Sequence, residues 1–230
     1  MKKMILATKL AVVCMLSCCN LVVNAQCSVE SAIDSLREGN KRFCENRMVH
    51  QHQDLTRIKE LTEGQHPFAV VISCSDSRVT PEIVFDQGLG DLFSIRTAGN
   101  VMADFEEGSV EYAVDHLNTK LVVVLGHTCC GAVKAFLDTK ENNEGHEHHH
   151  GDLGHIQSII DKFDSEEEEQ ECLKKKEDLY NQAILANVKN GVRQLRESDP
   201  ILAKMQKEHK IEIVGAIYHI ENGVVEFLNL

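Results

Sequence analysis

Two short runs of apolar residues constrain the fold of this chain more than any other feature. Residues 68–73 read FAVVIS and residues 121–125 read LVVVL, without the alternation of apolar and polar side chains that a half-exposed strand shows. An uninterrupted apolar run of this length, rich in β-branched residues, indicates a strand that is covered on both faces. Such strands are typical of the parallel sheets of α/β proteins.

Further strands and helices are predicted around these two runs. Residues 91–96 and 211–220 are additional strand candidates, and Asn222-Gly223 predicts a hairpin that leads into residues 224–228. Apolar residues recur with helical spacing in four stretches, at 28–47, 109–117, 132–137 and 180–195. Strands separated by helices imply right-handed crossovers. We therefore expect an α/β fold with a central, mainly parallel β-sheet flanked by helices.

The first part of the chain has the pattern of an export signal. Residues 1–25 begin with lysines, continue with an apolar core at 10–19 that is too short to span a bilayer, and end in a small-residue cleavage pattern. We expect export to a bacterial periplasm, with residues 26–230 as one domain and no membrane span. The alternative is a lipid anchor on Cys18 or Cys19, because the residues around them loosely resemble a lipid-attachment box.

Two charged stretches interrupt the regular pattern. Residues 142–155 form a histidine-rich insert with five histidines, which is either a mobile polar loop or a loose metal reservoir. Residues 166–176 read EEEEQECLKKK, and we interpret them as a solvated helix face. The formal net charge of the chain is −12. Because such a chain repels phosphate backbones and anionic lipid, we do not expect it to bind nucleic acid or a membrane surface.

Cysteine, histidine and aspartate residues follow the two apolar runs where the predicted strands end. Cys74 and Asp76 follow the first run, and His127 and Cys130 follow the second. In α/β sheets ligands gather at the carboxyl ends of the strands, so we expect these side chains to lie close together. Two thiolates and one imidazole suit zinc, and a set of three protein ligands leaves a fourth position for water. The alternative is that the cysteines are ordinary buried thiols.

Asp76 and Arg78 form a second candidate pair. On an extended segment they would point the same way, so we expect a bidentate ion pair between them. The alternative is a structural salt bridge. Next to a metal ion, an arginine that holds the carboxylate would keep it off the metal and leave it free to accept a hydrogen bond from a bound water. Whether Asp76 or water is the fourth ligand stays open from the sequence.

The order and spacing of these motifs resemble the β-class carbonic anhydrases, in their plant-type branch. The resemblance covers about residues 65–133 and rests on the motifs CSDSRV from Cys74, GDLF from Gly90, RTAGN from Arg96, EYAV from Glu111 and GHxxCG from Gly126. It implies a zinc α/β enzyme of the β-carbonic anhydrase type that interconverts carbon dioxide and bicarbonate. It also implies a homodimer or a dimer of dimers.

The resemblance further implies roles for individual residues. One zinc ion per chain would be held by Cys74, His127 and Cys130. Asp76 and Arg78 would form the catalytic pair, and Asp76 would become a further zinc ligand when Arg78 no longer holds it. The substrate pocket would be lined by Gln65, Phe93, Tyr112 and Gly131. For Phe93 and Tyr112 the alternative is core packing, whereas Gly131 opens a predicted helix whose N–H groups could meet a bicarbonate oxygen.

Two other functions remain open at this stage. The same metal site could hydrolyse carbonyl sulfide or carbon disulfide. Alternatively, the chain could be a zinc-binding or zinc-buffering protein with a structural site, for which the histidine-rich insert is the main support. The Asp76–Arg78 pair argues against a structural site, because such a site needs neither residue.

Overall fold

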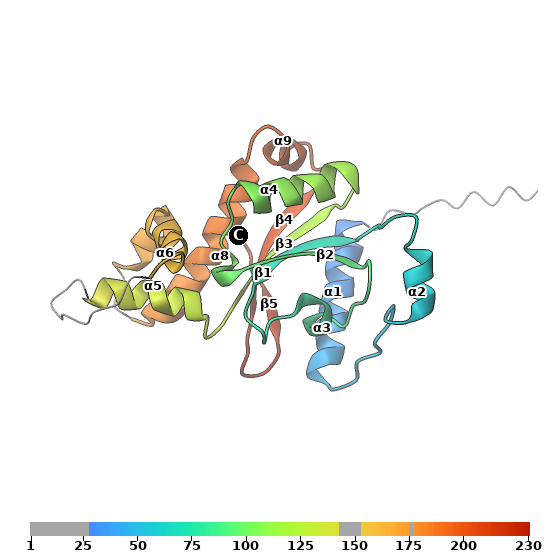
Figure 1. Cartoon of the computed structure of the whole chain (residues 1–230), viewed down its shortest axis with the longest axis horizontal. Helices are drawn as coiled ribbons and strands as arrows, with labels where there is room; N and C mark the ends of the chain where they lie inside the picture. Colours follow the sequence, from blue (N-terminus) through green and yellow to red (C-terminus); the bar gives the residue numbers. More distant parts are fainter. Residues whose placement is uncertain (1–27, 143–152, 175–176) are drawn as a thin grey trace, which may run out of the picture.

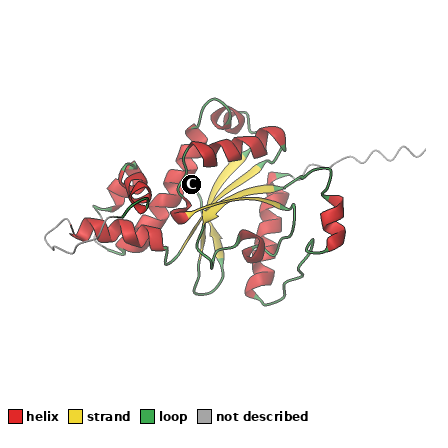
Figure 2. Ribbon diagram, viewed as in Figure 1, coloured by secondary structure: helices red, strands yellow, loops and turns green. Residues whose placement is uncertain are grey.

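A single sheet of five strands organises the chain, with the order β2-β1-β3-β4-β5 (Figures 1 and 2). The computed structural model describes residues 28–142, 153–174 and 177–230. The strands are β1 Ala69–Cys74, β2 Leu92–Thr97, β3 Leu121–His127, β4 Glu212–Tyr218 and β5 Val225–Phe227. The first four are parallel and β5 is antiparallel to β4, so the prediction of a mainly parallel sheet is confirmed.

Helices cover both faces of the sheet, which explains why its central strands are apolar throughout. Alternate residues of β1 face opposite sides, with Val70 and Ile72 in one apolar cluster and Ala69 and Val71 in the other. Their burial leaves no position of β1 for a polar side chain before Ser73. The first cluster is completed from α4 Asp104–Glu111, η2 Tyr112–His116, α8 Leu179–Glu197 and α9 Leu202–Lys207, and the second from α1 Val29–Cys44 and α3 Pro81–Val84.

A third apolar cluster lies beyond the carboxyl ends of the strands. Its side chains come from α5 Gly131–Asn142, α6 Ile156–Asp164, α7 Glu167–Cys172 and the first half of α8, and they enclose Cys74 and Cys130. Figure 1 shows α5 and α6 projecting past the edge of the sheet. This group of helices therefore forms a wall beside the place where the predicted metal ligands follow their strands.

Most predicted elements are confirmed, including the hairpin. Gly223 has a φ of +82°, and its N–H donates to the carbonyl of His219 at 2.7 Å. This turn reverses the chain between β4 and β5, and a positive φ there suits glycine. The helix predicted at 109–117 differs from the observed one in its bounds and type. Helix α4 begins already at Asp104, and the chain continues after Glu111 as a short π-helix over Tyr112–His116. The short helix α2 Leu55–Glu60 was not predicted, and neither were α3, α6 and α9.

The interpretation of residues 166–176 as a solvated helix face is confirmed only in part: Glu167, Gln170 and Glu171 are exposed, while residues 175–176 lie outside the described residues. Helix α7 ends at Cys172 and packs on α8, and within it Glu169 and Cys172 are buried. The run of charged residues did not reveal these two buried positions, since only one side of this short helix is exposed to solvent.

Two predictions concern segments outside the described residues. The signal peptide lies there entirely, as do residues 143–152 of the histidine-rich insert. Within the part of the chain that the structure describes, no helix has the length and apolar character that crossing a membrane requires.

Candidate metal centre and active site

Three metal-ligating side chains meet at the carboxyl ends of β1 and β3. Cys74 is the last residue of β1, His127 is the last residue of β3, and Cys130 directly precedes α5. One ligand atom from each lies within 4.8 Å of the others, and all three residues are buried. Parallel pairing of β1 with β3 brings the two strand ends to the same edge of the sheet. The predicted ligand set is therefore assembled in the fold.

The imidazole of His127 is held in the form that a metal ligand needs. Its Nδ1 lies 2.8 Å from the carbonyl oxygen of Thr128, so Nδ1 carries the proton and donates it to that oxygen. Its Nε2 is buried and has no hydrogen-bond partner among the described residues. A buried nitrogen whose lone pair points into a cluster of two thiols fits a metal ion. The residues present thus fit a metal of the kind that thiolate and imidazole ligands bind.

Hydrogen bonds and mutual contact set the pKa values of the two thiols of the cluster apart, lowering that of Cys74 and raising that of Cys130. Cys74 Sγ accepts hydrogen bonds from the backbone N–H groups of Asp76 at 3.4 Å and of Gly99 at 3.2 Å. The contact with Cys130 lowers the pKa of Cys74 to about 4, and these N–H groups act in the same direction. The pKa of Cys130 is raised by the same contact and by burial. Because two adjacent thiolates repel each other, the second proton leaves readily only when a cation is bound.

Asp76 and Arg78 form the predicted bidentate pair. Arg78 Nε donates to Asp76 Oδ1 at 2.9 Å, and Nη2 donates to Oδ2 at 2.7 Å. The hydrogen bonds from Arg78 lower the pKa of Asp76 to about 2, so its carboxylate is ionised at neutral pH. The segment is a turn and not extended as predicted, because Val79 N–H donates to the carbonyl of Asp76 at 3.0 Å.

The prediction of Asp76 as a metal ligand finds no support in this geometry. Both of its carboxylate oxygens are engaged by Arg78, and the group of residues able to share a metal ion comprises Cys74, His127 and Cys130 alone among the described residues. The arginine therefore holds the carboxylate beside the ligand cluster and not in it.

Comparison with known proteins agrees with this geometry. A family model described as carbonic anhydrase matches residues 69–225, which contain the whole ligand cluster. A carbonic anhydrase of Mycolicibacterium smegmatis is 38% identical over 198 residues, which are 85% of this chain and 91% of the relative. The solved structure of the β-carbonic anhydrase CcaA has a TM-score of 0.65 at 28% identity and covers 86% of this chain and 95% of its own. This chain belongs to the β-class carbonic anhydrases.

A second solved structure supports the class. The β-carbonic anhydrase CafA of Aspergillus fumigatus has a TM-score of 0.62 at 28% identity, covering 87% of this chain and 90% of its own. The resemblance to this class that the sequence motifs indicated is thereby confirmed.

Within this β-class chain, further side chains hold the loops of the ligand cluster in place. Arg96 donates to the carbonyl of Cys74 at 3.2 Å and to that of Asp76 at 2.8 Å. Tyr180 Oη donates to the carbonyl of Cys130 at 2.7 Å. Sequence reasoning gave neither residue a role. The position of Arg96 inside the RTAGN motif was a signal, whereas Tyr180 is 50 residues away from Cys130 on α8 and belongs to no motif.

The adjacent cysteines 129 and 130 have different surroundings. Cys130 is buried in the cluster, while Cys129 is exposed and has a φ of +56°. Gly131 follows as the first residue of α5 and is exposed, and a Cβ at this position would contact nothing within 4 Å. The N-terminus of α5 thus begins beside the cluster with open space at Gly131, and the role of this residue toward bicarbonate stays a prediction.

The remaining predicted pocket residues of this carbonic anhydrase do not reach the cluster within one chain. Phe93 pairs with Val70 in the sheet, whereas Cys74 pairs with Thr97. At about 3.3 Å per residue, Phe93 lies ~13 Å along the strand from the level of Cys74. Tyr112 packs beside Phe93 with their ring centroids 6.3 Å apart, and it is 46% exposed.

Gln65 lies still further from the cluster. It is exposed and precedes β1, at the opposite end of that strand from Cys74. One chain therefore supplies the ligands, the Asp76–Arg78 pair and the helix N-terminus, but not the wall that Gln65, Phe93 and Tyr112 were predicted to form. The alternative of core packing for Tyr112 also fails, since nearly half of its surface is exposed.

Proposed function

We propose that this carbonic anhydrase contains one zinc ion per chain and catalyses the reversible hydration of carbon dioxide to bicarbonate and a proton. The observation that carries the proposal is the cluster of Cys74, His127 and Cys130, with Asp76 held beside it by Arg78. Two thiols and one imidazole are ligands that zinc prefers, and three protein ligands are typical of a catalytic zinc site.

The protein side of the mechanism follows from the groups around the cluster. A zinc ion held there supplies a Lewis acid and lowers the pKa of water toward neutrality. Asp76 is ionised because the hydrogen bonds from Arg78 lower its pKa to about 2, so its carboxylate can accept a hydrogen bond from the attacking water and orient it. Arg78 holds that carboxylate away from the ligand position. The N-terminus of α5 at Gly131 favours the negative charge of the product.

We also propose that the active assembly is a homodimer or a dimer of dimers. Phe93 and Tyr112 form an aromatic pair in which Tyr112 is 46% exposed, and Phe105 of α4 is 86% exposed. Apolar surface of this kind is typical of an interface between chains. Because Gln65, Phe93 and Tyr112 do not reach the cluster within the described part of one chain, we propose that a second chain supplies them to the predicted pocket. Light scattering of the purified protein would test this, and a monomer that retains full turnover would contradict it.

Export is also part of the proposal, because residues 1–25 have the pattern of an export signal. We propose that cleavage after Ala25 releases residues 26–230 into the periplasm. The mass of the mature protein from the native host tests this. A mass that includes residues 1–25, or a lipid on Cys18 or Cys19, would contradict it.

The matched cysteine pair gives the sharpest test of the proposed activity. We expect Cys130→Ser to lose zinc and carbon dioxide hydration, because Cys130 is in the cluster, while the exposed Cys129→Ser retains both. Zinc per chain is measured by mass spectrometry, and hydration at pH 8.5 by stopped flow before and after chelation. A wild type that binds zinc without turnover would refute the enzyme function, and the reverse behaviour of the two variants would refute the ligand assignment.

A further inference from the structure

A buried asparagine on α8 connects to the ligand cluster through one glycine residue. Asn187 Nδ2 donates to the carbonyl of Gly99 at 2.8 Å, and the N–H of the same glycine donates to Cys74 Sγ at 3.2 Å. Asn187 is 5% exposed and lies 88 residues from Gly99 in the chain. The N–H and the carbonyl belong to the two peptide groups on either side of the Gly99 Cα, so the φ and ψ angles of Gly99 determine whether the N–H points at the sulfur while the carbonyl meets Asn187.

The conformation of Gly99 needs such a restraint. Its φ is +69°, a region that glycine enters freely and leaves freely. On its Cα side it is packed closely, because a Cβ there would lie 2.8 Å from Phe163 Cζ and 2.9 Å from Ala132 Cβ. These contacts limit where the residue lies, but apolar packing does not select the direction of its N–H and carbonyl groups. Hydrogen bonds do so, and Asn187 makes the one to the carbonyl.

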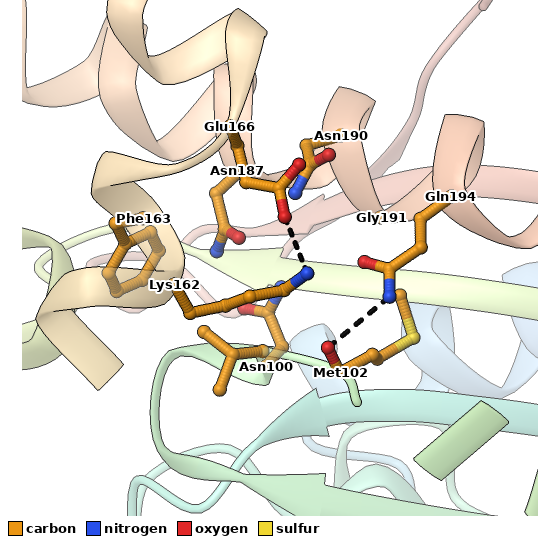
Figure 3. A pocket seen from close by; sticks show the side chains of 10 residues that line it. Asn100, Met102, Lys162, Phe163, Glu166, Asn187, Asn190, Gly191 and Gln194 are labelled. Atoms are coloured by element: carbon orange, nitrogen blue, oxygen red, sulfur yellow. Dashed lines mark hydrogen bonds and ion pairs between the residues drawn. The ribbon is translucent and has the colours of Figure 1, made fainter. Parts of the chain in front are cut away.

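The space between this loop and α8 is polar and loosely filled. Figure 3 shows Asn187, Asn190 and Gln194 entering a small cavity from α8, with Asn100 and Met102 on the facing loop. The cavity has a volume of about 10 Å³, which is close to the space of one water molecule. Asn100 Nδ2 is buried there without a hydrogen-bond partner among the described residues. Apolar contacts, such as that of Met102 with Gly191 of α8, hold the loop in place, whereas polar contacts, among them the bond from Asn187 to Gly99, orient its peptide groups.

We propose that Asn187 is a positioning residue for the metal centre: by holding the carbonyl of Gly99 it restricts the backbone torsions of this residue, so that the N–H on the other side of its Cα stays directed at Cys74 Sγ. The inference rests on the proposed metal function of the cluster. A hydrogen bond to a ligating thiolate draws electron density from the sulfur and holds the ligand in one orientation. Groups that orient metal ligands in this way commonly change metal affinity by about 10- to 100-fold when they are removed. Because Asn187 acts through Gly99, we expect the lower end of that range.

Asn190 offers a matched control for the test. It lies one turn further along α8, is also 5% exposed and lines the same cavity, but its Oδ1 accepts from Arg193 at 2.9 Å and it has no bond to Gly99 in the described contacts. Asn187→Leu and Asn190→Leu therefore remove similar buried amides from the same helix. The full chain would be loaded with Co²⁺ in place of zinc, and the energy of the thiolate-to-cobalt absorption band and the dissociation constant for Co²⁺ would be measured.

The expected result separates the two variants. Asn187→Leu should shift the absorption band to lower energy, because a thiolate with one donor fewer releases charge more easily, and should weaken Co²⁺ binding about tenfold. Asn190→Leu should keep wild-type values for both. If Asn187→Leu does not fold, the smaller Asn187→Ala gives the same comparison. An Asn187 variant with the band and affinity of the wild type would overturn this inference alone. A wild type without any thiolate-to-cobalt band would overturn the proposed metal centre and this inference with it.

Discussion

Replacing Glu169 with glutamine tests how a buried acid limits the stability of this protein. Glu169 lies in α7 and is 1% exposed, and both of its carboxylate oxygens lack a hydrogen-bond partner among the described residues. The nearby Arg193 is engaged elsewhere, since its Nε donates to Glu168 at 2.7 Å. Burial raises the pKa of Glu169 to about 8, the charges of Glu166 and Glu168 add to the rise, and Arg193 opposes it.

The sign of the pH dependence follows from where the proton is held. The ordinary pKa of a glutamate side chain, 4.5, applies to the unfolded chain, and the raised pKa of about 8 applies to the folded protein. Between these two pH values the folded protein keeps a proton on Glu169 that the unfolded chain has lost. The stability from this group is therefore complete below pH 4.5 and is lost as the pH rises toward 8. One pKa unit corresponds to about 1.4 kcal/mol, so the full loss is ~5 kcal/mol. A glutamine at position 169 cannot ionise, so the variant does not lose this stability as the pH rises.

We expect Glu169→Gln to raise the free energy of unfolding by about 2–5 kcal/mol at pH 8.5 and by about 1 kcal/mol or less at pH 5. Urea denaturation at both pH values, at one protein concentration, gives the difference from wild type and cancels the titration of all other groups. Glu171→Gln is the control, because it removes the same charge from the same helix at an exposed position and should change stability by less than about 0.5 kcal/mol. An equal effect of Glu169→Gln at both pH values, or a loss of stability at pH 8.5, would refute the reasoning.

Three further predictions concern the active site and its surroundings. Arg78→Ala should retain zinc but lose at least about two orders of magnitude in carbon dioxide hydration, because the freed Asp76 can take the open ligand position; a structure of the variant with water still on the metal and full activity would contradict this. Deletion of residues 146–150 should leave hydration intact, since none of these histidines belongs to the motifs at residues 74–131 that supply the ligand cluster, and a loss of more than about tenfold in a folded variant would count against it. Gly99→Ala should destabilise the fold by about 1–3 kcal/mol, because its Cβ would lie 2.8 Å from Phe163 Cζ at a positive φ, and urea denaturation that shows no change would contradict this packing.

Local patterns in the sequence were sufficient for the parallel sheet and for the ligand cluster. The apolar runs at 68–73 and 121–125 indicate strands covered on both faces, because positions removed from water are mostly occupied by apolar side chains. Cys74 and His127 end those strands, and parallel pairing brings neighbouring strand ends together. The pair of Asp76 and Arg78 is also local, so it followed from the spacing even though the backbone there is a turn.

The tertiary structure decided what depends on contacts between distant segments. The burial of Glu169 depends on α7 lying on α8, which no pattern within the acidic run reveals. Asn187 and Tyr180 act on the ligand loops from 88 and 50 residues away, and helical periodicity records only that α8 has a buried side. Likewise, the motif placed Phe93 in the pocket, yet its strand register puts it ~13 Å from the level of Cys74. A motif records which residues occur together in a family, whereas the distance between them is set by the register of the sheet and by the packing of helices on it.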